Sequence, residues 1–154
     1  EYLVYPLAFS LGASLIAMVG TNIGAGKRER AARIAWTGAA LAGAVTGAIG
    51  LLGAIVPGLW TGLFTTTPEI SAVAARYLAG FGPAFGFLGA GLTLATSFQA
   101  AGRPLWPLLA TSGRVLVVVA GGWVAVRAGA DLLAFALIAA AGFVVYGEIG
   151  RAHV

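Results

Sequence analysis

The sequence contains no cysteine, which excludes a disulfide framework and any metal site built on thiolate ligands. Charged residues make up only 9% of the chain, whereas a soluble domain carries charge on about a quarter of its residues. Catalytic signatures are missing too. There is no carboxylate pair, and the glycine-rich stretch at residues 20–26 lacks the Lys-Ser/Thr ending of a phosphate-binding loop. These absences argue against a soluble domain and against an enzyme, and we expect no cofactor and no metal.

Apolar residues are what the chain has in abundance. Hydrophobic residues make up 60% of it, the mean hydropathy is +0.96, and 24 glycines suit helices that pack closely in lipid. The net charge of +4 and the pI near 10.1 would also suit a nucleic-acid-binding protein, but the basic residues lie in short loops between apolar spans. We therefore expect a membrane protein whose partner is the lipid bilayer, with no nucleic-acid partner.

Five apolar segments predict the architecture. They cover residues 3–22, 34–56, 70–99, 105–126 and 132–146. A bilayer core needs about 20 apolar residues per helix, and the alternating ten-residue strands of a barrel are absent. The predicted fold class is all-α, a polytopic transmembrane helical bundle of about five helices. The fifth segment is short, as expected for a helix cut by truncation.

The last seven residues, 148–154, resemble the translation of a common DNA-sequencing adapter. We therefore expect residues 1–147 to form a partial native bundle and residues 148–154 not to be native. Since His153 is the only histidine, the native part then offers no imidazole for catalysis, metal binding or proton relay.

Signals between the spans predict how the helices begin, end and bend. Gly24 and Gly26 follow the first span, where glycine readily takes a left-handed φ. Thr67 is the predicted N-cap of the third helix, with Pro68 at its first position and Glu69 in its first turn. Pro83 predicts a kink inside the third span, which is either a plain bend or part of a gating motion.

The basic residues predict the orientation. They lie in the loops after the first and third spans: Lys27, Arg28, Arg30, Arg33 and Arg103. Two spans separate these loops, so both lie on one face, which the positive-inside rule makes cytoplasmic. The loop at residues 57–68 has no Lys or Arg, as expected of an outer loop. Arg127 is the one contrary residue.

Small residues spaced four apart can bring two membrane helices into close contact. Three such pairs occur: Gly43 with Gly47, Gly58 with Gly62, and Gly82 with Gly86. Each pair is either a helix contact or a chance product of the high glycine content. Thr93, Thr96 and Ser97 are expected to bond within their own helix rather than to a ligand.

Arg114 is the charged residue predicted at mid-membrane depth, about ten residues into the fourth span, where an arginine costs about 2.5–3.5 kcal/mol. No carboxylate lies at matching depth. Arg114 therefore meets a partner outside this chain, meets backbone carbonyls, or extends toward the headgroups. Gln99 ends the third span and Asn22 the first. Each of the two either lines a substrate cavity together with Arg114 or only forms hydrogen bonds at the end of its own helix.

Three sequence segments resemble the multidrug and toxic compound extrusion (MATE) transporters. Residues 19–31, VGTNIGAGKRERA, are similar to the family pattern V-G-Q-N-x-G-A-G that joins two helices on the cytoplasmic side. Residues 63–70, LFTTTPEI, resemble the outer-loop pattern L-F-T-x-D-P-E-V. Residues 97–104, SFQAAGRP, resemble the cytoplasmic turn F-Q-G-x-G-R/K. Thr21 replaces the usual glutamine and Thr67 the usual aspartate.

The resemblance covers residues 3–147, and residues 112–114 are similar to the S-x-x-R of the C-terminal half of the family. It implies helices eight to twelve of twelve, in a secondary antiporter of the bacterial inner membrane that exports cationic or amphipathic drug-like compounds in exchange for H⁺ or Na⁺. The third span has no acidic residue where one branch of the family places a coupling aspartate. The ion-coupling site is then expected in the missing N-terminal half, which is also the expected partner of this chain.

Two alternatives remain open at this point. A lipid-linked oligosaccharide flippase of the same superfamily would carry more basic residues within its spans than the single Arg114. A noncatalytic membrane scaffold subunit would be encoded by a gene that ends after five or six helices, with no second homologous half.

Overall fold

The computed structural model describes the backbone of residues 4–151 and the side chains of residues 5–146. The described residues form helices joined by turns, without a strand, and the predicted all-α class is confirmed. In chain order the elements are α1 (Val4–Gly24), α2 (Arg28–Ile55), α3 (Pro57–Thr61), α4 (Pro68–Phe81), the 3-10 helix η1 (Gly82–Ala84), α5 (Phe85–Ala100), α6 (Leu105–Arg127) and α7 (Leu132–Arg151).

Four helical stretches of the described chain are long and apolar enough to cross a membrane. They are Tyr5–Gly24, Arg28–Ile55, Pro68–Ala100 and Leu105–Arg127, and the apolar part of α7, Leu132–Tyr146, is shorter. Large apolar side chains cover the outer surface of α6, where Leu116 and Val119 are each more than 60% exposed. An apolar surface of this extent is suited to contact with lipid.

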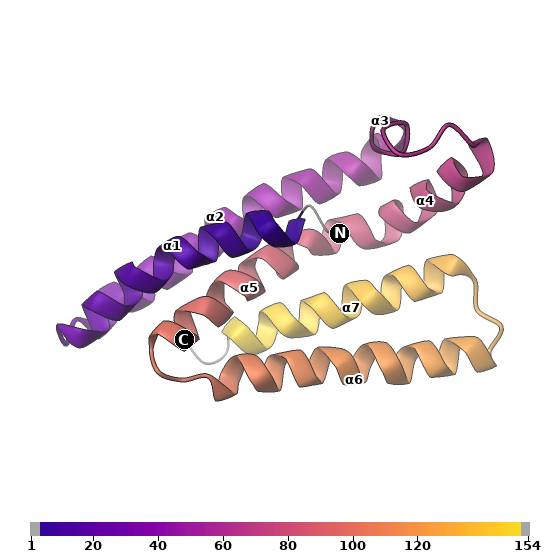
Figure 1. Ribbon diagram of the computed structural model, residues 1–154. Coiled ribbons are helices and arrows are strands. Elements are labelled where there is room, and N and C mark those ends of the chain that lie inside the picture. Colours follow the sequence, from indigo (N-terminus) through magenta and orange to yellow (C-terminus); the bar gives the residue numbers. More distant parts are fainter. Residues whose placement is uncertain (1–3, 152–154) are drawn as a thin grey trace.

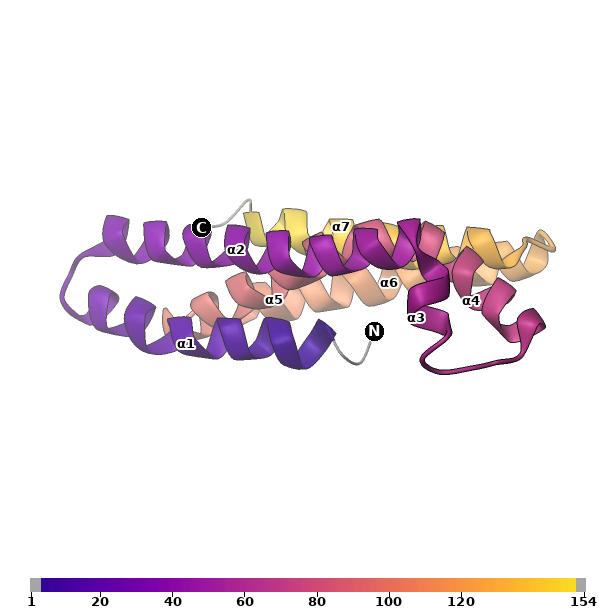
Figure 2. The same cartoon turned by 90° about the horizontal axis from the view of Figure 1, so that it is seen from above.

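The helices pack around α5. Figure 1 shows α5 between the α1–α2 hairpin and α7, with α6 on the far side of α7. Figure 2, seen from above, shows α1 and α2 side by side. α3 and the start of α4 lie at the end of the molecule opposite the turn between α1 and α2. The turns after α1 and after α5 lie at one end in both views, so the basic residues gather there as predicted.

Glycines form the contact between α2 and the α4–α5 segment. A Cβ built on Gly43 would lie 3.0 Å from the carbonyl oxygen of Gly86, and one built on Gly47 would lie 3.4 Å from the Gly86 Cα. One turn further on, Gly50 packs directly against the backbone of Gly82. Two of the three predicted glycine pairs are therefore helix contacts, and they contact each other.

The third glycine pair makes no helix contact. Gly58 lies in α3, a short helix inside the predicted loop at residues 57–68, which begins with Pro57 at a position that needs no N–H partner. A Cβ on Gly58 would meet no atom within 4 Å, and one on Gly62 would meet only the Gly58 carbonyl. These glycines therefore belong to a tight turn rather than to packing between helices.

The third predicted span is broken, as its proline predicts. Pro83 lies in η1, which separates α4 from α5. Beside this break the Thr46 hydroxyl of α2 lies 2.8 Å from the carbonyl oxygen of Phe85 and 2.8 Å from that of Ala42, and Thr46 is fully buried. The kink is thus held by a polar contact between two helices.

Gly26 ends α1 as predicted, whereas Gly24 is still the last residue of that helix, and Gly102 ends α5 in the same way as Gly26. Gly26 has φ +74° and Gly102 has φ +71°. After α1 the Lys27 N–H donates to the Asn22 carbonyl at 2.8 Å, and after α5 the Arg103 N–H donates to the Phe98 carbonyl at 2.9 Å. These six-to-one bonds are Schellman motifs, which satisfy the last carbonyls of each helix.

Two boundary predictions were wrong. Arg28, Arg30 and Arg33 lie in the first turns of α2, which begins six residues before the predicted span, because Ala31 and Ala35 extend its buried face onto α1. α7 continues to Arg151 rather than ending near residue 146, since no proline interrupts it. The predicted start of α4 is confirmed: Thr67 is the N-cap, Pro68 begins the helix and Glu69 lies in its first turn, although the Thr67 side chain makes no capping bond. The Thr67 N–H instead donates to the Thr65 hydroxyl at 3.1 Å.

Candidate functional site around Arg114

Arg114 lies in the first half of α6 and is half-buried. Its Nη1 donates a hydrogen bond of 3.2 Å to the Tyr5 hydroxyl of α1. Its guanidinium carbon lies 4.2 Å from the centroid of the Phe143 ring of α7. One side chain therefore joins three helices, and its two contacts come from opposite ends of the chain.

The close approach of α7 depends on Gly142. A Cβ at this position would lie 3.3 Å from Arg114 Cγ and 2.9 Å from Val118 Cγ2. With glycine there, the backbone of α7 lies against the aliphatic stem of Arg114. The next residue, Phe143, can then present its ring to the guanidinium.

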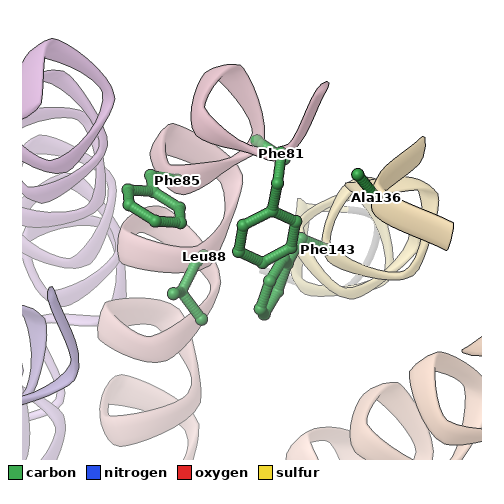
Figure 3. Packing of buried hydrophobic residues seen from close by; sticks show 6 residues of the cluster. Phe81, Phe85, Leu88, Ala136 and Phe143 are labelled. Carbon is green, nitrogen blue, oxygen red and sulfur yellow. The ribbon is translucent and has the colours of Figure 1, made fainter. Parts of the chain in front are cut away.

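Phe143 connects Arg114 to the break in the third span. Its ring is 1% exposed and lies 5.1 Å from the ring of Phe81, centroid to centroid. Phe81 in turn lies 5.2 Å from Phe85, across η1, in an edge-to-face contact. Figure 3 shows these rings with Leu88 and Ala136 in one buried cluster. Packing at the break is therefore continuous with packing around Arg114.

The contacts of Arg114 are neutral and come from aromatic side chains, which sequence reasoning did not foresee. A desolvated cation over an aromatic face gains about 2 kcal/mol, comparable with the cost of about 2.5–3.5 kcal/mol for an arginine at this depth. No described acidic side chain forms an ion pair with Arg114. The acidic residues whose side chains the structure describes, Glu29, Glu69 and Asp131, stand at helix ends, and Asp131 accepts the Ala134 N–H at 3.1 Å.

Asn22 and Gln99 lie away from Arg114. Asn22 is half-buried near the end of α1, and its side-chain amide donates to the Met18 carbonyl at 2.8 Å. Gln99 is exposed near the end of α5. Both are at the basic end of the bundle, so the structure does not gather the three residues into one site.

The hydroxyls of α5 stay within their helix, as predicted. Thr93 donates to the Gly89 carbonyl at 2.9 Å, and Thr96 and Ser97 both donate to the Thr93 carbonyl, at 2.8 and 3.0 Å. In the described part of the chain no three His, Cys, Asp or Glu side chains lie close enough to hold a metal ion.

A family match agrees with this architecture of apolar helices. The family model described as MatE matches residues 1–124, from α1 to the last turn of α6. The chain belongs to the MatE family. As a MatE protein it is an integral membrane protein with a transport function, and the family contains transporters rather than enzymes. No curated protein and no solved structure matched the chain.

Tyr5 and Phe143 are the contact residues that sequence reasoning missed. Tyr5 stands near the start of an apolar span, and Phe143 lies beyond the residues that the MatE model matches. The only signal in the sequence was the expected depth of each residue in the membrane, compared with that of Arg114. Depth cannot identify Tyr5 or Phe143 unless the packing of α1 and α7 against α6 is already known.

Proposed function

We propose that this chain is part of the C-terminal half of a secondary multidrug antiporter in the bacterial inner membrane. It would supply helices eight to twelve of twelve and export cationic or amphipathic drug-like compounds in exchange for H⁺ or Na⁺. The observation that carries the proposal is the MatE match across residues 1–124. Transporters built from repeats bind their substrate between the two halves, which then rock to give alternating access.

Arg114 is the residue of this half that we assign to the cavity wall. A charge inside a membrane bundle is a functional candidate by default, and this one is held in place by Tyr5 and Phe143. A guanidinium has five N–H donors, so one bond to Tyr5 leaves others for a substrate or for a carboxylate of the N-terminal half. The ring of Phe143 is buried beneath the guanidinium, so it positions Arg114 rather than contacting a substrate. Gln99 and Asn22 are assigned only to the cytoplasmic mouth of the cavity.

The ion-coupling carboxylate is assigned to the missing N-terminal half. The broken span Pro68–Ala100 contains one acidic residue, Glu69, which lies in the first turn of α4 at the outer end. The described chain thus offers no carboxylate at mid-membrane depth for H⁺ or Na⁺ to bind.

Transport by the complete protein tests the proposal. The uninterrupted reading frame around this segment is expressed, and ethidium is added outside inverted vesicles as the cationic probe, because export from the cytoplasm is uptake into such vesicles. We expect ethidium movement when either a pH gradient or a Na⁺ gradient is imposed, and none with the 154-residue chain alone. No movement with either gradient, together with transport of a lipid-linked oligosaccharide, would favour the flippase. A reading frame that encodes no second half of helices would favour the noncatalytic scaffold subunit.

Arg114→Gln tests the assignment of the cavity wall. We expect ethidium transport to fall at least about tenfold, the loss typical when one charged hydrogen bond is removed from a binding site. The matched control is Arg127→Gln in the same helix. Arg127 stacks on Trp123 at 3.8 Å near the outer end and is exposed. Equal losses in both variants would show that Arg114 has no special role in transport.

A further inference from the structure

A cavity of about 270 Å³ lies at the basic end of the bundle, between the ends of α1, α2 and α5. Two arginines line it from different turns of the chain. Arg28 is the first residue of α2, and Arg103 follows the glycine turn after α5. Because the dipole of α2 adds positive potential at its N-terminus, both the helix and the side chains favour an anion here.

Most of the remaining lining of the cavity is apolar, and its residues are buried or half-buried. Val19 of α1 is 3% exposed and Phe98 of α5 is 6% exposed, and alanines of α2 complete this part of the lining. Ser97 adds one buried hydroxyl. The cavity is therefore divided into an apolar floor and a cationic rim, and its volume is close to the lower limit of about 300 Å³ for ligand pockets.

Neither arginine at the rim has a partner in the described part of the chain. Arg28 and Arg103 are exposed, and neither forms a hydrogen bond, ion pair or ring contact with another described residue. The charged neighbours of Arg28 in sequence are Lys27, Glu29 and Arg30, of which only Glu29 is negative. The rim thus keeps a net positive charge and free guanidinium donors.

We propose that this cavity binds the phosphate group of an anionic amphiphile, with the phosphate between Arg28 and Arg103 and the apolar part against Val19 and Phe98. Guanidinium groups hold phosphate through paired, charge-assisted hydrogen bonds. Basic pockets between membrane helices on the cytoplasmic side are suited to phospholipid headgroups. An apolar floor favours a phospholipid over inorganic phosphate, because inorganic phosphate has no apolar group that could contact the floor. The proposal is independent of antiport, because a structural lipid can be bound whether or not the protein transports drugs.

Native mass spectrometry of the intact protein measures this binding. The protein is released from detergent micelles that contain equal amounts of phosphatidylglycerol and phosphatidylcholine. We expect phosphatidylglycerol to be retained in preference to phosphatidylcholine. Arg28→Gln/Arg103→Gln is expected to weaken phosphatidylglycerol binding at least about tenfold, since a hydrogen bond to a charged group is worth that factor or more.

The matched control is Arg30→Gln/Arg33→Gln. It removes the same amount of charge from the same basic end of the bundle, at exposed positions of α2 that do not line the cavity. Its phosphatidylglycerol binding is expected to change by less than about twofold, because single exposed charges contribute little. Equal weakening in the two double variants would overturn the proposal and leave only a general attraction to anionic lipid.

Two further measurements complete the test. Ala32→Leu fills the cavity from a half-buried position and keeps both arginines, so it should weaken retention even if the arginine variant fails to fold. Inorganic phosphate is added as a competitor to distinguish the two sources of the anion. Displacement of the lipid at millimolar phosphate would identify a soluble phosphate as the ligand, whereas no displacement identifies the lipid. Equal retention of both lipids by the unmodified protein would also overturn the proposal.

Discussion

At Gly50 of α2 there is no room for a methyl group. An added Cβ would meet the carbonyl of Gly82 and would lie 2.9 Å from the Cβ of Phe85. Neither neighbour is the flexible end of a side chain, so the helices themselves must move apart. At single positions such as this one, the distance between α2 and α5 is set by backbone rather than by side chains.

Gly50→Ala is therefore expected to lower the free energy of unfolding by about 1–3 kcal/mol, the usual cost of overpacking. The control is Gly122→Ala in α6, where an added Cβ meets no atom within 4 Å. That change should be neutral, or stabilising by up to about 1 kcal/mol, because alanine favours helix. Unfolding in mixed detergent micelles measures both. Equal stability of the two variants would contradict the close contact.

A double-mutant cycle tests the bond between Arg114 and Tyr5. Tyr5→Phe keeps the ring and removes the hydroxyl, and Arg114→Gln removes the charge. The coupling free energy is expected near 0.6 kcal/mol and no higher than about 1.7 kcal/mol, the range for side-chain hydrogen bonds inside membrane proteins. Unfolding of the two single variants and the double variant gives the value. Strict additivity would show that the two side chains do not interact.

The α4–η1–α5 segment determines the geometry at the scale of elements. Pro83 interrupts its hydrogen bonding, and Thr46 of α2 contacts the first carbonyl of α5 just after the interruption. Such a break needs partners from a neighbouring helix, since lipid offers none. The segment is thus two helices joined by a supported turn.

Thr46→Val should destabilise the bundle by about 0.6–1.7 kcal/mol, because it deletes the hydroxyl between two helices while keeping the shape of the side chain. Thr93→Val is the matched control. Thr93 is also fully buried, but its hydroxyl bonds only to Gly89 of its own helix. The control should therefore lose less stability, and thermal unfolding in detergent compares the two. A larger loss for Thr93→Val would contradict the role of Thr46.

Much of the fold could be predicted at this scale, and the reasons are local. Runs of apolar residues identified the spans, Pro83 identified the break, and Gly26 identified a helix end, since each signal acts within a few residues of itself. The pairing of Gly50 with Gly82 could not be predicted, because it depends on which helices are neighbours. For the same reason Tyr5 and Phe143 could not be assigned to Arg114 from the sequence.

For the whole molecule, both basic turns lie at one end and the α2–α3–α4 and α6–α7 connections lie at the other. From the positive-inside rule we expect the basic end to be cytoplasmic. The absence of cysteine allows a direct check, since any introduced thiol is then the only one in this chain.

Single-cysteine variants are expected to react from opposite sides of the membrane. Thr66→Cys and Ala128→Cys should be labelled by an impermeant maleimide in intact cells, and Ala25→Cys only in inverted vesicles. All three positions are exposed. Labelling of Ala25→Cys from outside would reverse the orientation and would place Arg28 and Arg103 on the outer face.

The helices also differ in length, which matters once they share one bilayer. α2 has 28 residues and spans about 42 Å, whereas α6 has 23 residues and spans about 35 Å, and the hydrocarbon core is about 30 Å thick. The excess length of α2 must be taken up by tilt or by projection into the headgroups. Because α2 is joined to α5 backbone to backbone, the two must tilt as a unit. Any change in tilt that a thinner or thicker bilayer imposes on α2 is then expected to move α5 with it, relative to the α6–α7 hairpin.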